Sequence, residues 1–194
     1  MRRLVVATRN PGKAREVAQA LSDLPLEIVS LESYPAAPEV EETGSTFTEN
    51  ASLKARAYAD FTGELTLADD SGLVVDALDG APGVYSSRFA PDDLERNLRL
   101  LKQLEHVPDE ARTARFVCAI AVAEPGDRVW TCEGTVEGLI ARAMRGSHGF
   151  GYDPIFYLPE LGKHMAELAP EQKNAISHRG KALACAREFL ELRC

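Results

Sequence analysis

Cysteine is scarce in this sequence. Only four of the 194 residues are cysteines, and no two of them form a CxxC pair. A zinc site built from paired thiolates and a dithiol redox motif are therefore not indicated. We expect reduced thiols, two of them buried in strands, among Cys118, Cys132, Cys185 and Cys194. Cys118 and Cys132 flank the turn signal Glu124-Pro125-Gly126-Asp127 and could face each other across a hairpin, but a reducing compartment disfavours a disulfide there.

Long apolar segments are also lacking. The longest apolar run, Phe116 to Ala123, is far too short to cross a bilayer. The first residues, Met1-Arg2-Arg3 followed by Leu4-Val5-Val6, form no extended signal region and no small-residue cleavage site. We therefore expect a cytoplasmic protein with no membrane partner.

Positive charge is in deficit. The chain has 22 Lys and Arg against 30 Asp and Glu, a formal net charge of -8. Direct nucleic-acid binding is disfavoured, because it requires many cations to neutralise phosphates. A small polyanion can still bind where a few cations converge and a divalent metal adds charge.

What is present is ordinary globular composition, with 45% hydrophobic and 27% charged residues. The length allows one domain over residues 1–194, with one core or two closely joined lobes. Period-2 and period-3.6 patterns alternate without an internal repeat. They predict an α/β protein with a mixed sheet.

The N-terminal half predicts a strand, a tight turn and a helix, then a second strand, a loop and a second helix. The second helix places Asn50 and Lys54 four residues apart, so they project together. A strand then ends at Asp69-Asp70, where Ser71-Gly72 favours a tight turn. The predicted ranges are strands Arg3–Thr8, Leu26–Leu31 and Leu65–Ala68, and helices Lys13–Leu24 and Phe47–Phe61.

The C-terminal half predicts a helix at Asp92–Leu104, whose Leu94, Leu98, Leu101 and Leu104 share one face. Two strands follow around the Pro125-Gly126 turn, and a further one covers Thr135–Ala141. The spacing of apolar residues predicts one helix over Gln172–Leu192.

The first candidate site is the strand-to-helix turn Thr8-Arg9-Asn10-Pro11-Gly12-Lys13. Free backbone N–H groups, the positive end of the helix dipole and the Lys13 ammonium would bind an anion there. The turn is not a Walker A loop, since its first Gly is missing and Ala14 stands in the place of Ser or Thr. The alternative is an ordinary turn.

Two acidic doublets, Glu41-Glu42 and Asp69-Asp70, offer the hard oxygen ligands that Mg²⁺ prefers, and a carboxylate can act as a general base. The alternative is a pair of solvated surface doublets or N-caps. Lys54 either points into a polar cleft to counter a phosphate or is a surface lysine.

Two further segments contain concentrated polar and aromatic groups. In Gly149-Phe150-Gly151-Tyr152-Asp153-Pro154 the glycines allow close backbone approach and Phe150 offers a stacking face. Lys173 to Arg179 brings four polar side chains to a predicted helix start. The alternatives are a turn packed by aromatics and an exposed helix terminus.

These motifs together resemble the inosine/xanthosine triphosphate pyrophosphatase family, which removes noncanonical purine nucleotides from the triphosphate pool. The resemblance covers nearly the whole chain, in order. It rests on Thr8-x-Asn10-x-Gly12-Lys13, Glu41-Glu42-Thr43-Gly44-x-Thr46-Phe47-x-Glu49-Asn50-Ala51-x-x-Lys54-Ala55, Ala68-Asp69-Asp70-Ser71-Gly72-Leu73, Gly149-Phe150-Gly151-Tyr152-Asp153-Pro154 and Ile176-Ser177-His178-Arg179.

The resemblance implies an elongated two-lobed fold around a mixed β-sheet with flanking helices, a homodimer, and a central active-site cleft for Mg²⁺ and the triphosphate. It implies that Glu41 and Asp70 hold Mg²⁺ and that Asp70 accepts the proton of the attacking water. The implied substrate-binding residues are Thr8, Arg9, Asn10, Pro11, Gly12, Lys13, Lys54, Ser71, Phe150, Gly151, Tyr152, Asp153, Lys173, His178 and Arg179.

The implied reaction converts ITP, dITP or XTP to the monophosphate and pyrophosphate, which keeps deaminated purines out of DNA and RNA. We expect backbone N–H groups of the Phe150 loop (residues 149–154) and the His178-Arg179 pair to donate hydrogen bonds to a 6-oxo group and to reject the 6-amino group of adenine. Two alternatives stay open: a pyrophosphatase acting on modified pyrimidine nucleotides, and a nucleotide sensor without turnover.

Overall fold

The computed structural model describes residues 2–126 and 128–193. These residues form two units. Unit 1 contains residues 1–70, 118–134 and 178–194, and unit 2 contains residues 71–117 and 135–177. Among the described residues, no helix has both the length and the apolar character needed to cross a membrane.

The sheet has seven strands in the order β2-β1-β3-β4-β5-β6-β7. β1 pairs in parallel with both β2 and β3, whereas β6 is antiparallel to β5 and to β7. The predicted mixed sheet with flanking helices is therefore confirmed. The strands are β1 (Arg2–Val6), β2 (Leu26–Ser30), β3 (Leu65–Val75), β4 (Thr113–Ala123), β5 (Trp130–Ile140), β6 (Phe156–Leu158) and β7 (Lys163–His164).

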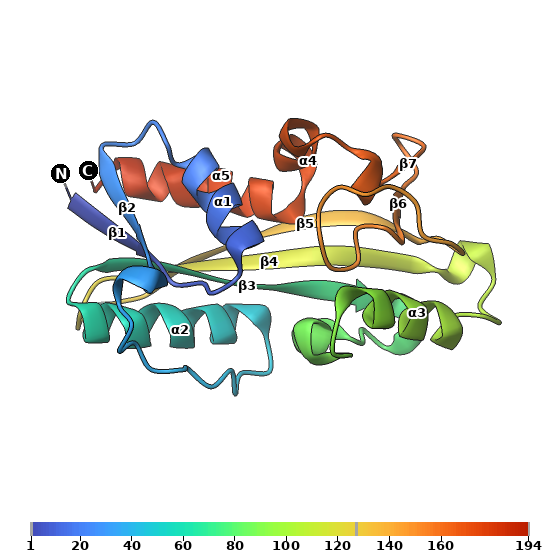
Figure 1. The fold of residues 1–194 in the computed structure, drawn as a ribbon, viewed down its shortest axis with the longest axis horizontal. Coiled ribbons are helices and arrows are strands. Elements are labelled where there is room, and N and C mark those ends of the chain that lie inside the picture. The colour runs from blue at the N-terminus through green and yellow to red at the C-terminus, as the bar shows by residue number, and fades with distance from the viewer. Residues whose placement is uncertain (1, 127, 194) are drawn as a thin grey trace. The chain divides into compact units, whose positions relative to one another are not determined.

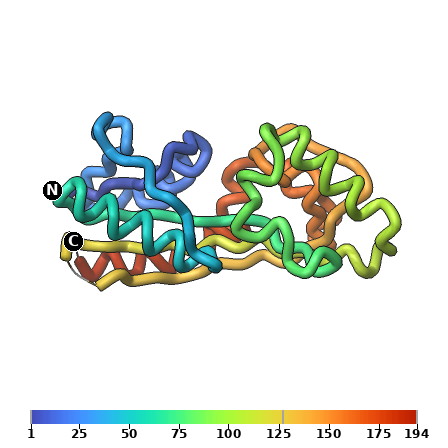
Figure 2. The backbone as a smooth tube through the Cα atoms, turned by 90° about the horizontal axis from the view of Figure 1, so that it is seen from below, coloured from blue at the N-terminus to red at the C-terminus, as the bar shows by residue number. Residues whose placement is uncertain are grey.

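In unit 1, three helices cover the two faces of the sheet. α1 (Pro11–Ala20) and α5 (His178–Glu191) lie on one face and α2 (Phe47–Thr62) on the other (Figure 1), and α2 is in front in the view from below (Figure 2). The α1 and α5 face forms a core with alternate residues of β3 and β4, among them Leu65, Leu67 and Ile120.

α2 is defined by its ends. The Thr46 hydroxyl accepts the Glu49 N–H and the Glu49 carboxylate accepts the Thr46 N–H, a capping box that stabilises the first turn. Gly63 ends the helix in the left-handed region, where a residue without Cβ is not strained. This fixed start holds Asn50 about one turn and Lys54 about two turns inside the helix.

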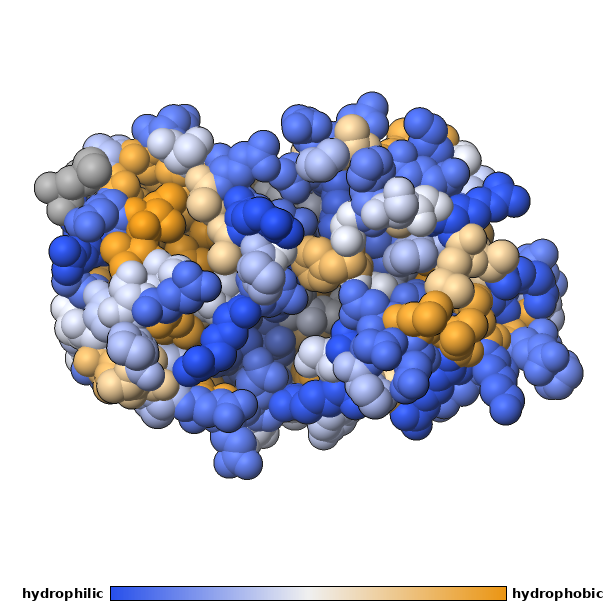
Figure 3. Space-filling view, viewed as in Figure 1, coloured by the Kyte–Doolittle hydropathy of each residue, from blue (hydrophilic) through white to orange (hydrophobic). Residues whose placement is uncertain are grey.

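In unit 2, a second core joins the far parts of β3, β4 and β5 to α3 (Asp93–Gln103), to β6 and to the Tyr152 segment. α4 (Pro170–Ile176) completes this unit. The α3 core face differs from the sequence prediction: Leu94 and Leu98 are exposed, while Asn97 and Leu100 are buried. An apolar patch over α3 is visible in Figure 3.

Three predicted element boundaries were wrong. β3 does not end at Asp69-Asp70 but continues to Val75, because cations pair with the buried acids and the strand hydrogen bonds continue. The predicted strand Thr135–Ala141 is not separate, because Thr135 to Ile140 form the second part of the single strand β5. The C-terminal helix is broken at Ser177, whose extended backbone (φ -68°, ψ 159°) separates α4 from α5.

The described cysteines are all free: Cys118, Cys132 and Cys185. Cys118 is buried in β4, whereas Cys132 donates to the carbonyl of Ala182 on α5. Cys194 and Asp127 of the predicted turn lie outside the described residues.

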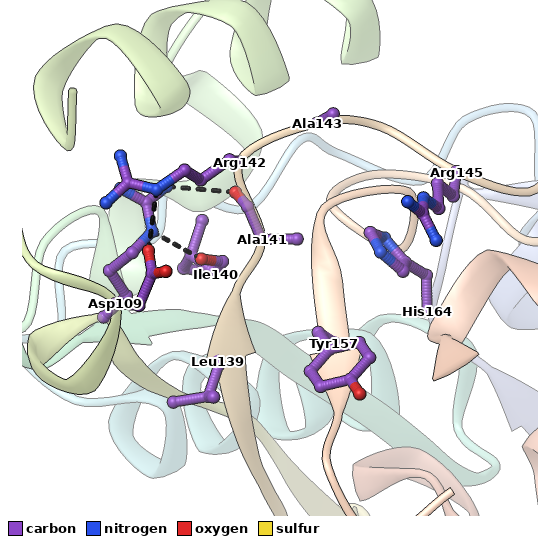
Figure 4. A pocket seen from close by; sticks show the side chains of 10 residues that line it. Asp109, Leu139, Ile140, Ala141, Arg142, Ala143, Arg145, Tyr157 and His164 are labelled. Carbon is purple, nitrogen blue, oxygen red and sulfur yellow. Dashed lines mark hydrogen bonds and ion pairs between the residues drawn. The ribbon is translucent and has the colours of Figure 1, made fainter. Parts of the chain in front are cut away.

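A pocket of about 370 Å³ in unit 2 is lined by Asp109, Arg142, Tyr157 and His164, among others (Figure 4), and it contains none of the predicted site residues. Arg112, which also lines the pocket, is 2% exposed and donates from Nε to Ile140 O at 2.6 Å and from Nη2 to Ala141 O at 3.0 Å. Its other terminal nitrogen donates to Leu104 O. The guanidinium therefore serves the fold.

Replacing Arg112 by leucine is expected to lower the free energy of unfolding by about 2 to 3 kcal/mol, because three buried carbonyls lose their donors. Urea unfolding of Arg112→Leu and of Arg145→Leu, an exposed arginine at the same pocket, measures this. Equal, small changes in both variants would mean that the carbonyls are satisfied without the guanidinium.

Candidate active site

The turn from Thr8 to Lys13 connects β1 to α1, as predicted. Asn10 caps α1, and its side-chain oxygen accepts the N–H groups of Gly12 at 2.8 Å and Lys13 at 3.2 Å. The expectation that these N–H groups are free for an anion is therefore wrong in this structure, because the asparagine side chain occupies them. Side-chain cations and the helix dipole remain for an anion, and Arg9 is tied to Ala37 O at 3.1 Å.

Lys13 belongs to a buried charge network centred on Asp69. The Asp69 carboxylate lies 2.8 Å from Lys13 Nζ and 3.4 Å from Arg179 Nε. Arg179 is 2% exposed and also pairs with Glu16 at 2.5 Å. Burial alone would raise the pKa of Asp69, but Lys13, Arg179 and Lys54 more than offset it and hold that pKa well below its usual range. Asp69 is therefore ionised and structurally tied.

Asp70 has different neighbours. Its carboxylate accepts from Asn50 Nδ2 at 3.1 Å and lies 3.9 Å from Lys54 Nζ, which also pairs with Glu42 at 2.5 Å. The predicted projection of Asn50 and Lys54 to the same side is confirmed. Burial is the main cause that raises the pKa of Asp70; the Glu42 charge adds to it, while Lys54, Lys13 and Asn50 oppose it.

The two neighbouring aspartates serve different layers because successive strand side chains point to opposite faces. Asp69 follows Leu65 and Leu67 on the face covered by α1 and α5, while Asp70 contacts α2 on the other face. A carboxylate in a raised-pKa environment beside a lysine is suited to accept a proton from a substrate water. Asp70 is such a group.

A divalent cation fits the donors on the Asp70 face. Among the described residues no group of three or more His, Cys, Asp or Glu side chains surrounds a metal position. Mg²⁺ needs only one or two protein carboxylates and takes its other ligands from water and phosphate. Asp70 and the acidic doublet before α2 can supply them: Lys54 lies close to both Glu42 and Asp70, and Glu41 is exposed.

In unit 2, the Phe150 loop and α4 are joined by charge. Lys173 is 5% exposed and its Nζ lies 2.7 Å from Asp153 Oδ2 and 4.7 Å from the centre of the Phe150 ring. Asp153 also accepts the Phe150 N–H at 2.9 Å. A Cβ at Gly149 would collide with the Asp153 carboxylate, so this turn requires glycine.

The loop's backbone donors are less available than expected. The Phe150 N–H is taken by Asp153, and the Gly151 N–H donates to Asp93 Oδ2 at 2.7 Å. The prediction that these N–H groups are free to donate to a 6-oxo group is therefore wrong for this structure, because they already donate to carboxylates. The Tyr152 hydroxyl donates to Ser86 O at 2.9 Å and packs in the core of unit 2.

The predicted site residues thus fall into one set in each unit. Unit 1 brings Lys13, Lys54, Asp70 and Arg179 to β3, and His178 begins α5, where Gly134 of β5 leaves room for its backbone. Unit 2 brings together Phe150, Asp153 and Lys173 and carries Ser71 within β3.

Sequence reasoning assigned no role to several residues that organise these sets. Glu42 and Asp69 belong to the doublets that were noticed, and the spacing of Asn50 to Lys54 indicated a shared face. No sequence signal pointed to the partners contributed from distant segments, namely Glu16, Asp93 and Asn97.

The sequence and fold are similar to those of known proteins over nearly the whole chain. The model of the Ham1 family matches residues 4–189. The dITP/XTP pyrophosphatase of Desulforamulus reducens is 56% identical over 191 residues, covering 97% of this chain and 95% of the relative. That of Geobacter sulfurreducens is 55% identical, covering 98% and 97%. The structure of a HAM1 protein from Coxiella burnetii superposes with a TM-score of 0.91 at 47% identity, covering 98% of both chains.

Proposed function

Because the chain belongs to the Ham1 family, we propose that it hydrolyses noncanonical purine nucleoside triphosphates to the monophosphate and pyrophosphate. ITP, dITP and XTP are the substrates, and the reaction keeps deaminated purines out of DNA and RNA. The observation that best supports this function is the cluster of two buried aspartates with two lysines beside the β1–α1 turn.

In the proposed reaction, a water oxygen bonds to the α-phosphorus while the bond from that phosphorus to the α–β bridging oxygen breaks. Asp70 accepts the proton of the water, and pyrophosphate leaves. Lys13 and Lys54 offset the negative charge that develops on the leaving group. For the remaining phosphate contacts we assign Ser71 and the turn residues Thr8, Arg9, Asn10, Pro11 and Gly12, where a phosphate oxygen would replace the Asn10 side chain at the Gly12 N–H.

The cation we propose is Mg²⁺, held by Asp70 and Glu41, with Glu42 close enough to Asp70 to influence its charge. When bound, it supplies positive charge that polarises the phosphate oxygens. Asn50 orients Asp70 by donating to Oδ2, so the other carboxylate oxygen faces Lys54.

Base recognition is assigned to a further group of residues. We assign Phe150 to stacking, and Gly151, Tyr152, Asp153, Lys173, His178 and Arg179 to enclosing the base. Since Arg179 is paired with Asp69 and Glu16, its contribution includes fixing the start of α5, where His178 lies.

We take residues 1–194 as one nucleoside triphosphate pyrophosphatase domain with two lobes, which correspond to the two units. The protein is a homodimer in the cytoplasm that binds small nucleotides rather than nucleic acid, consistent with its net charge of -8. Sedimentation velocity measures the proposed dimer.

The decisive experiment measures the release of pyrophosphate and of orthophosphate from ITP, XTP, ATP and GTP, each with Mg²⁺ and with EDTA. We expect pyrophosphate and the monophosphate from ITP and XTP with Mg²⁺, little product from ATP or GTP, and loss of turnover in EDTA. Orthophosphate with the diphosphate would mean that the wrong bond was assigned. Tight binding of ITP without product would mean that the protein is a sensor.

A further inference from the structure

α3 holds Gly151 by both of its backbone polar groups. The Gly151 N–H donates to Asp93 Oδ2 at 2.7 Å, and Asn97 Nδ2 donates to the Gly151 carbonyl at 2.8 Å. Asp93 and Asn97 are four residues apart on α3 and therefore lie on one side of the helix. Two side chains of one rigid element thus fix the orientation of one peptide segment in the Phe150 loop.

The two side chains are themselves held in place. Arg96 Nη1 lies 2.6 Å from Asp93 Oδ1, and Arg96 Nε donates to Ala90 O at 3.0 Å. Asn97 Nδ2 also donates to Asp93 O at 2.6 Å. These contacts restrict the rotamers of both side chains, which is the condition for placing a ligand-binding loop accurately.

Asn97 carries a cost that an apolar core residue would avoid. It is 2% exposed, and its Oδ1 is buried without a hydrogen-bond partner among the described residues. An unpaired buried acceptor is unfavourable, so other contacts of the same side chain must offset it. The two hydrogen bonds from Asn97 Nδ2 provide this compensation, because a leucine at this position would leave the Gly151 carbonyl without this donor.

Gly151 is a position at which backbone rotation would change the path of the loop. Its φ of +64° lies in the left-handed region, and it separates Phe150 from Tyr152. Tyr152 is anchored in the core through Ser86, and Phe150 lies against Lys173. Rotation at Gly151 would therefore move the Phe150 ring and leave Tyr152 in place.

We propose that Asp93 and Asn97 are positioning residues that set base selectivity by fixing Gly151 and thereby the Phe150 ring. The proposal rests on the proposed function, in which the Phe150 loop contacts the base. Neither side chain needs to touch the nucleotide. Loosening the hold should weaken discrimination between 6-oxo and 6-amino purines and should leave the chemistry at the phosphates intact.

The test compares Asp93→Ala with Asp93→Asn, whose amide oxygen can still accept the Gly151 N–H. Because the Asp93 side chain is 49% exposed, neither change should unfold the protein. The matched control is Glu95→Ala, which removes another exposed acid from the first turn of α3. For each protein, kcat and KM are measured for ITP and ATP, and their binding is measured by calorimetry without turnover.

Asp93→Ala is expected to reduce the ITP to ATP ratio of kcat/KM about tenfold, mainly through KM, the size of one lost charged hydrogen bond. Asp93→Asn should restore most of it, and the Glu95→Ala control should match the wild type. An unchanged ratio in Asp93→Ala, or an equal loss for both nucleotides, would overturn the proposal.

Failure of the proposed function has a different signature, because the wild type would then release no pyrophosphate from ITP. The ratio of the binding constants for ITP and ATP would still show whether the hydrogen bonds from Asp93 and Asn97 to Gly151 affect base selectivity. If the wild type bound ITP and ATP equally, base selectivity by Asp93 and Asn97 would be refuted as well.

Discussion

Replacing Asp70 by asparagine is expected to lower kcat for ITP about 10³-fold, within the range for loss of a general base. The amide keeps the shape of the side chain but cannot take the proton of the attacking water, and it is a poor ligand for a divalent cation. Asn50 and Lys54 would remain in place beside it.

The same change should not cost stability. Burial raises the pKa of Asp70, which means that the folded state disfavours its ionised form. A neutral amide therefore removes an unfavourable buried charge, and the midpoint of urea unfolding should stay equal or rise. Asp60→Asn on the exposed side of α2 is the matched control for charge loss. Turnover within tenfold of the wild type would remove Asp70 from the role of base.

Replacing Asp69 by asparagine is expected to have the opposite outcome, a loss of about 3 to 5 kcal/mol in the free energy of unfolding. Asp69 is 3% exposed and its charge is favoured by Lys13 and Arg179, so its pKa lies below the usual range. Without the carboxylate, Lys13 and Arg179 would lose the anion that they share, while Glu16 would still pair with Arg179.

Urea unfolding of Asp69→Asn measures this loss, and Asp23→Asn is its matched control. Asp23 also pairs with an arginine of α5, Arg187 at 2.7 Å, but on the exposed surface. Since exposed ion pairs contribute little, the control should change stability far less. Equal changes in the two variants would show that the Asp69 network is screened like a surface pair.

The sequence already contained much of the local structure. The pairing of Thr46 with Glu49 and the apolar stripe of α2 follow from side-chain chemistry within one helical turn, so the start of α2 and the joint direction of Asn50 and Lys54 could be predicted. The five motifs in their order were sufficient to indicate the family, which the comparisons then confirmed.

Local patterns failed where distant residues altered local preferences. Asp69-Asp70 resembles a strand end because charged residues rarely continue a buried strand, yet cations from α1, α2 and α5 allow β3 to continue. The predicted free N–H groups at Gly12 and Gly151 are occupied, one by a local cap and the other by Asp93, 58 residues away.

The sequence by itself determined the family, the mixed α/β class and which residue types are available for phosphate, metal and base, because these depend on composition and short-range spacing. Only the tertiary structure decided that the pKa of Asp69 is lowered and that of Asp70 is raised. Their difference arises from the alternation of β3, which presents one carboxylate to Lys13 and Arg179 and the other to Asn50 and Lys54. The pKa of a buried carboxylate is set by such neighbours, and their positions come from chain segments that sequence spacing does not relate.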